Sequence, residues 1–128
     1  MVLDTSALVA VLLDEPERAE FVEKIAAAPR RLVSAGTLLE CAVVLEARRG
    51  EAAGRELDLF LHRADVQTIA VNEEQTLLAR AAWRRYGKGR HPAGLNFGDL
   101  FAYALARTTG DELLFKGDDF ARTDVVPA

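Results

Sequence analysis

Acidic side chains follow two of the apolar stretches that the sequence predicts to be buried strands. Asp4 comes directly after a two-residue apolar stretch, and Asp118 and Asp119 lie just beyond the apolar residues 113–115. Open α/β folds place their ligand sites at the carboxyl ends of such strands. If the two strands are neighbours where a doubly wound sheet reverses direction, these carboxylates share one edge of the sheet.

Two further acids fall in predicted helices. Glu40 is the single polar residue between residues 38 and 45, so we expect a helix that is apolar on all sides and mostly buried. Asp99 lies in the first turn of a helix predicted from about residue 96 to residue 107. Burying a bare carboxylate is costly, so each of these acids must be hydrogen-bonded, paired or bound to a cation.

Most of these acids also have a purely structural explanation. Asp4 can cap the helix that follows it. Asp99 can complement a helix dipole, and Asp118 and Asp119 can shape a turn. Glu40 has no such routine role, because a carboxylate in an apolar surrounding needs a partner.

Convergence of four such acids would require a counter-charge. At an effective dielectric constant of about 20, two like charges about 4 Å apart repel by roughly 4 kcal/mol. His62 and His91 are isolated, and Cys41 lies in an apolar run, so the available ligands are all oxygen atoms. Such ligands suit Mg²⁺ or Mn²⁺ better than Zn²⁺. Mg²⁺ held by carboxylates with open positions is typical of phosphodiester chemistry.

The elements that would position these acids alternate between strand and helix. Strands are predicted at residues 2–3, 31–34, 66–71 and 113–115, and a fifth strand at residues 125–126 is left open. Helices are predicted at residues 35–49, 51–63, 73–86 and about 96–107, with shorter ones before residue 29. Alternation of this kind predicts right-handed crossovers and a parallel sheet of four to five strands with helices on both faces. We therefore expect a single-domain α/β three-layer sandwich.

Composition limits the partners. The 128 residues are 50% hydrophobic and 28% charged, as in a folded domain, and the net charge of −4 gives no global attraction for nucleic acid. Contacts with nucleic acid would therefore need local basic residues, for which Lys88, Arg90 and Lys116 are the candidates near the acids. The single cysteine, Cys41, excludes an internal disulfide and fits a reducing cytoplasm. No apolar run is long enough for a membrane span, so we expect a cytoplasmic protein.

Three stretches resemble the PIN-domain ribonucleases, and the VapC-type toxins among them. They are VLDTSAL at residues 2–8, LNFGDLFAYA at residues 95–104 and LFKGDDF at residues 114–120, with Glu40 in a helix between the first two. The resemblance covers the whole chain and implies a PIN domain over residues 1–128.

That resemblance also implies an activity and a site. The chain would be a Mg²⁺-dependent endoribonuclease, with Mn²⁺ as an alternative ion, and the toxic half of a type II toxin–antitoxin pair. Its metal-binding acids would be Asp4, Glu40, Asp99 and one of Asp118 and Asp119, of which we favour Asp118. Ser6 would be a supporting hydroxyl near the metal and the RNA. The implied partners are RNA, a cognate antitoxin, a second copy in a homodimer, and a toxin–antitoxin hetero-oligomer.

Two other functions fit the sequence less well. A receiver-like signalling domain needs paired acids after its first strand and an aspartate after its third, whereas here only Asp4 follows the first and Asn72 the third. A catalytically silent PIN-like interaction module would not need the complete set of acids.

Overall fold

A parallel four-stranded sheet forms the centre of the protein, whose computed structural model describes all 128 residues. The strands are β1 (Val2–Leu3), β2 (Arg31–Ser34), β3 (Val66–Ile69) and β4 (Leu113–Leu114), in the order β3-β2-β1-β4. β1 pairs with both β2 and β4. The expectation that the first and last predicted strands are neighbours is therefore confirmed.

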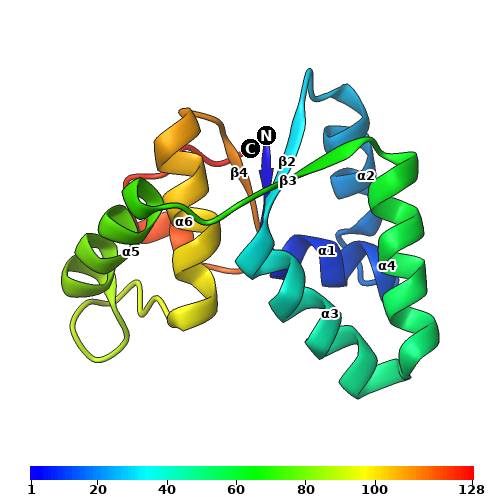
Figure 1. Ribbon diagram of the computed structural model, residues 1–128, viewed down its shortest axis with the longest axis horizontal. Coiled ribbons are helices and arrows are strands. Elements are labelled where there is room, and N and C mark those ends of the chain that lie inside the picture. Colours follow the sequence, from blue (N-terminus) through cyan, green and yellow to red (C-terminus); the bar gives the residue numbers. More distant parts are fainter.

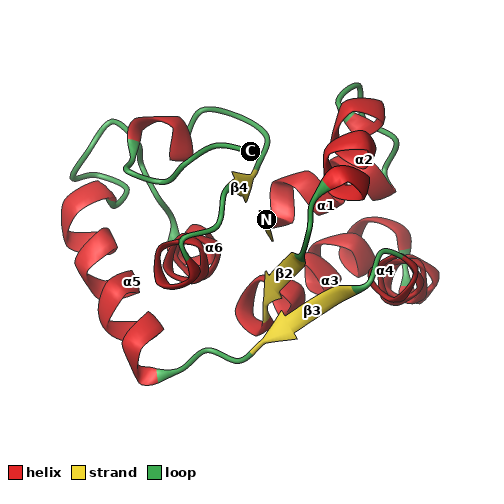
Figure 2. Cartoon of the chain, turned by 90° about the horizontal axis from the view of Figure 1, so that it is seen from above, coloured by secondary structure: helices red, strands yellow, loops and turns green.

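Helices cover both faces of this sheet (Figures 1 and 2). They are α1 (Thr5–Leu12), α2 (Arg18–Ala27), α3 (Ala35–Arg49), α4 (Glu51–Arg63), α5 (Glu73–Tyr86) and α6 (Phe97–Thr109), followed by the 3₁₀ helix η1 (Phe120–Arg122). α5 and α6 lie on one face, and α1 to α4 lie on the other (Figure 1). The predicted three-layer sandwich is confirmed. No helix combines the length and apolarity that crossing a bilayer would require.

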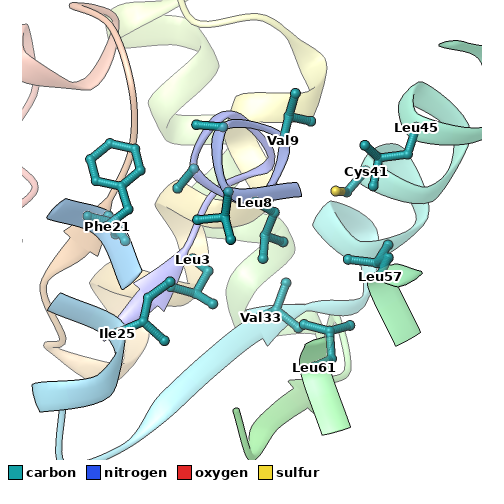
Figure 3. Close-up of a cluster of buried hydrophobic side chains, with 14 of the residues drawn as sticks. Leu3, Leu8, Val9, Phe21, Ile25, Val33, Cys41, Leu45, Leu57 and Leu61 are labelled. Carbon is teal, nitrogen blue, oxygen red and sulfur yellow. The ribbon is translucent and has the colours of Figure 1, made fainter. Parts of the chain in front are cut away.

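Consecutive residues of the short strands belong to two different hydrophobic cores. Leu3 and Val33 pack with α1 to α4 in a cluster that also contains Leu8, shown in Figure 3. The preceding residues, Val2 and Leu32, pack in a second cluster with α5 and α6. Because side chains alternate across a strand, a sheet covered on both faces needs apolar residues at every position. This requirement explains why the two-residue strands, β1 and β4, are wholly apolar.

Two predicted strands differ from the structure. The third ends at Ile69 and not at residue 71, because the Ala70 carbonyl accepts a hydrogen bond from the Gln75 side chain instead of a neighbouring strand. The fifth strand is absent. Its segment makes only one bridge to the sheet, between Leu113 and Pro127, and Val126 is exposed.

The prediction that residues 38–45 are buried on all sides is wrong. Cys41 and Leu45 are fully buried, but Leu39 is 67% and Val43 58% exposed. No other element of the chain covers this outer face of α3. Glu40 is consequently half-buried, beside the packed face of the helix and not enclosed within it.

Candidate active site

Asp4 lies at the carboxyl end of β1 and caps α1. One of its carboxylate oxygens, Oδ2, accepts hydrogen bonds from the Ser6 backbone N–H at 3.0 Å and from the Ser6 hydroxyl at 2.6 Å. The residue is only 3% exposed, yet its other oxygen, Oδ1, is buried without a partner. Burial, together with the charge of Glu40, raises the pKa of Asp4. Capping therefore accounts for one oxygen, and the second is free to bind a ligand.

Glu40 reaches the same region from α3. The Thr5 hydroxyl, in the first turn of α1, donates a hydrogen bond to Glu40 Oε1 at 2.5 Å. On the other side, α6 approaches so closely that a Cβ atom at Gly98 would lie 1.6 Å from Glu40 Oε2. Gly98 thus makes room for the glutamate between two helices, and Thr5 orients it.

Asp99, the residue after Gly98, both caps the start of α6 and is acted on by the charges of other acids. It forms a reciprocal capping box with Asn96, whose side chain accepts from the Asp99 N–H at 3.0 Å while Asp99 Oδ2 accepts from the Asn96 N–H at 2.9 Å. Burial, followed by the charges of Asp4, Asp119 and Glu40, nevertheless raises its pKa to about 7. The charges of three acids from separate elements, Asp4, Glu40 and Asp119, therefore all act on Asp99.

The structure distinguishes between the two terminal aspartates. Both are exposed in the turn after β4, but it is Asp119, at the start of η1, whose charge acts on Asp99. Asp118 uses its backbone carbonyl to accept from the Ala121 N–H at 3.2 Å. We therefore favour Asp119 as the fourth acid, in place of the Asp118 preferred from sequence.

Asp119→Asn is expected to reduce RNA cleavage at least tenfold more than Asp118→Asn, because Asp119, and not Asp118, is among the charges that act on Asp99. Both variants should fold normally, since neither side chain is buried. Initial cleavage rates of the two purified proteins, measured side by side, decide the assignment. A larger loss from Asp118→Asn would restore the original preference.

These acids fit a magnesium ion by chemistry, without forming a ready-made cage. No group of three or more His, Cys, Asp or Glu side chains in the structure could by itself hold a metal ion. Mg²⁺ does not need such a group, because it keeps several waters and is commonly held by one or two carboxylates together with phosphate oxygens. The unpartnered Asp4 Oδ1 and the all-oxygen ligand set are what such an ion requires.

Ser6 connects the acid after β1 to the turn after β4. Its hydroxyl donates to Asp4 Oδ2 and accepts from the Lys116 backbone N–H at 2.9 Å. Ser6 therefore lies beside Asp4, and its supporting role near a metal and the RNA stays a prediction. It holds Asp4 in place through two bonds and fixes the start of the turn that carries Asp119.

The three basic residues selected from sequence have different surroundings. Lys88 lines a cavity of about 680 Å³ between α5 and α6, and the Arg90 guanidinium lies 5.9 Å from the centre of the Trp83 ring. Both remain candidates for RNA contact. Lys116 differs, because its ammonium group lies within 3.2 Å of Glu15 and 3.1 Å of Glu17.

Thr5 and Gly98 were not predicted from sequence as parts of the site. Glycine in the first turn of a helix is unfavourable without a reason, and close approach of another group is the usual one. That signal identifies Gly98 in retrospect. Thr5 carries no comparable signal, because a hydroxyl beside a capping aspartate is common.

Cys41 takes no part in the chemistry. It is fully buried, as its apolar surroundings predicted. Burial, and then the charges of Asp4 and Glu40, raise the pKa of its thiol to about 12. Such a thiol stays protonated and unreactive at neutral pH.

Comparison with known proteins places the chain in a family. A model of the PIN domain matches residues 1–126. "Ribonuclease VapC" of Mycolicibacterium smegmatis is 59% identical over 98% of this chain and 97% of its own length. "Ribonuclease VapC30" of Mycobacterium tuberculosis is 58% identical over 98% of this chain and 95% of its own length.

Solved structures with low sequence identity share the fold. Mycobacterium tuberculosis VapC20, described as a sarcin-ricin loop cleaving toxin, superposes with a TM-score of 0.80 at 19% identity, covering 99% of this chain and 97% of that one. A toxin–antitoxin complex from Klebsiella pneumoniae gives a TM-score of 0.75 at 20% identity, covering 99% of this chain and 95% of that one.

The chain therefore belongs to the PIN-domain family and, within it, to the VapC ribonucleases. Membership excludes the receiver-like signalling domain.

Proposed function

We propose that the chain cleaves RNA with the help of Mg²⁺ and is the toxic component of a type II toxin–antitoxin module in the cytoplasm. One observation carries the proposal: the charges of Asp4, Glu40 and Asp119 all raise the pKa of Asp99, although the four come from separate elements. Carboxylates whose pKa is raised by burial and by neighbouring charges are typical of functional sites. The names of the close relatives supply the reaction.

In this proposal each residue has a defined task. Asp4 Oδ1, with Asp99, Glu40 and Asp119, would hold the ion, which when bound polarises a phosphate oxygen and activates a water molecule. Thr5 orients Glu40, and Ser6 orients Asp4. Lys88 and Arg90 would contact the RNA backbone, since a protein of net charge −4 must attract phosphates locally.

Mg²⁺ or Mn²⁺ is expected to stabilise the fold, because the ion relieves a repulsion that exists only in the native state. At a free concentration a hundred times its dissociation constant, the gain in unfolding free energy is about 2.7 kcal/mol. Thermal unfolding of EDTA-treated protein, with and without added Mn²⁺, measures this gain. An equal response from Asp4→Asn would contradict the assignment of Asp4.

An antitoxin segment would occupy the surface between α1, α2 and α4. Two adjoining hollows of about 370 and 460 Å³ share Leu12, Asp14 and Glu56. Apolar side chains such as Leu45, Val22 and Phe60 line them, as an amphipathic partner segment would require. An arginine from the partner could enter the acid site and take the place of the ion's charge.

A homodimer would use the face opposite to this groove. Phe97 is 76%, Val71 40% and Trp83 37% exposed, and all three line the cavity between α5 and α6. Apolar side chains exposed in such a group are typical of a protein–protein interface. The closed two-fold symmetry of most small oligomers makes a second copy the simplest partner for it.

Expression of the chain alone is expected to arrest bacterial growth, whereas expression together with its neighbouring antitoxin gene should not. Glu40→Gln should abolish the arrest without lowering the protein level, because it removes one acid of the site. Growth curves with matched immunoblots test this. If the wild-type chain and the Glu40→Gln protein are equally harmless, the toxin proposal fails.

A further inference from the structure

Lys116 is held at both ends. Its side chain forms ion pairs with Glu15 at 3.2 Å and Glu17 at 3.1 Å, both in the connection between α1 and α2. Its backbone N–H donates to the Ser6 hydroxyl, which in turn donates to Asp4. The residue therefore joins the α1–α2 connection to the hydrogen bonds that orient the first acid of the site.

The same residue begins the turn that carries the last acid. Gly117 follows with φ of +96°, a left-handed conformation suited to glycine, and Asp119, two residues later, is the N-cap residue of η1. All residues of this turn from Lys116 to Asp119 are exposed, and Phe120 is the first buried one after them, so few contacts fix the turn. A displaced Lys116 would carry Asp119 away from Asp99.

The charges around Lys116 argue against a direct contact with RNA. Its single positive charge faces two carboxylates, so the group of three is net negative. A phosphate approaching this ammonium group would have to displace Glu15 and Glu17 or remain beside them. Lysines that bind phosphate need an ammonium group free to do so.

We propose that Lys116 is a positioning residue: through Glu15 and Glu17 it fixes the turn that places Asp119 opposite Asp99 and keeps Ser6 bonded to Asp4. This inference rests on the proposed metal-dependent cleavage of RNA. Lys116, Glu15 and Glu17 would support the metal site without binding the ion. Lys116 would then not be one of the residues that contact RNA.

Two variants test the proposal from opposite sides, Lys116→Met and the double variant Glu15→Gln/Glu17→Gln. Lys24→Met is the matched control, because Lys24 is 37% exposed, compared with 36% for Lys116, and pairs with Glu20 at 2.8 Å on α2. For each protein, calorimetry gives the dissociation constant for Mn²⁺ without RNA. Steady-state cleavage gives kcat and KM, and thermal unfolding gives Tm.

The sign of the change in Mn²⁺ affinity separates positioning from simple electrostatics. By charge alone, removing Lys116 should strengthen Mn²⁺ binding, and removing the two glutamates should weaken it. If Lys116 positions the turn, both changes weaken binding, by about tenfold, as losing a residue that orients a metal ligand does. We expect kcat to fall together with the Mn²⁺ affinity, while KM for RNA stays unchanged. The triple variant Lys116→Met/Glu15→Gln/Glu17→Gln should lose no more activity than Lys116→Met or the double variant, because all three residues act as one unit.

Three results would overturn the proposal. One is tighter Mn²⁺ binding by Lys116→Met, and another is behaviour identical to that of Lys24→Met. The third is a higher KM for RNA with a reduced salt dependence, which would make Lys116 an RNA contact. If wild-type protein neither binds Mn²⁺ nor cleaves RNA, the proposed function itself fails. If it does both and only the variants disagree, the positioning role alone is wrong.

Discussion

Asp99→Asn is expected to reduce RNA cleavage on the order of a thousandfold while leaving the fold intact. A metal ion contributes several kcal/mol to catalysis of this kind, and about 1.4 kcal/mol corresponds to a factor of ten. The capping box survives the change, because an asparagine side-chain oxygen can still accept from the Asn96 N–H. Single-turnover cleavage at saturating Mg²⁺ measures the loss.

The stability of the same variant should depend differently on pH. The pKa of Asp99 rises from 3.8 to about 7, so between these values the unfolded chain has lost a proton that the native protein retains. Stability of the metal-free wild type should therefore fall as pH rises from about 4 to about 7, and this contribution should level off above it. We expect a loss of roughly 2 kcal/mol, about half the full value, because the carboxyl group is partly solvated.

Asp99→Asn should lack this decline and be the more stable protein at pH 8. Denaturant unfolding in EDTA at pH 5 and pH 8 compares the two directly. If the variant is instead the less stable protein at pH 8, Asp99 serves mainly to start α6.

Gly98→Ala is expected to reduce cleavage on the order of a hundredfold, the effect of displacing a functional group by about 1 Å. The added methyl carbon would lie 1.6 Å from Glu40 Oε2 and 2.4 Å from its Cδ. Glu40 must therefore leave the Thr5 hydroxyl and turn away from the other acids. The fold should tolerate the change, because the group that moves is the end of a flexible side chain and alanine favours the helix.

Gly54→Ala is the matched control for that experiment. Gly54 lies in α4, which carries no acid of the site. Its added methyl carbon would also meet the end of a glutamate side chain, at 2.7 Å from Glu46 Oε1. We expect its cleavage rate to equal that of the wild type. Equal losses from both variants would mean that Gly98 matters only for packing, and a fully active Gly98→Ala protein would remove Glu40 from the site.

The sequence was sufficient to predict that the acids after the first and last strands lie near one another, because that part of the candidate site follows from topology. Asp4 ends a strand that must be central, since it is apolar on both faces, and the strand before Asp119 pairs with it. Parallel strands bring their carboxyl ends to one edge, and α3 and α6 add Glu40 and Asp99. Asp118 and Asp119 are adjacent in a turn, and the direction of each side chain there depends on the backbone conformation. Turns have no residue periodicity from which the sequence could predict that conformation.

Burial of α3 and the role of Lys116 could not be predicted for a related reason. An apolar run is compatible with a helix enclosed by its own chain and with a helix that leaves one face uncovered. The exposed Leu39 and Val43 show that α3 is a helix that leaves one face uncovered. The pairing of Lys116 with Glu15 and Glu17 joins residues about a hundred positions apart, and only the packed fold brings them together.

The measurement closest to the central claim is RNA cleavage by the purified protein under control of divalent ions, with Asp4→Asn alongside. We predict no cleavage in EDTA, full recovery when Mg²⁺ or Mn²⁺ is restored in excess, and no recovery by the variant at any ion concentration. Cleavage that persists in EDTA, or that Asp4→Asn performs as well as the wild type, would contradict a metal-dependent site built on these acids.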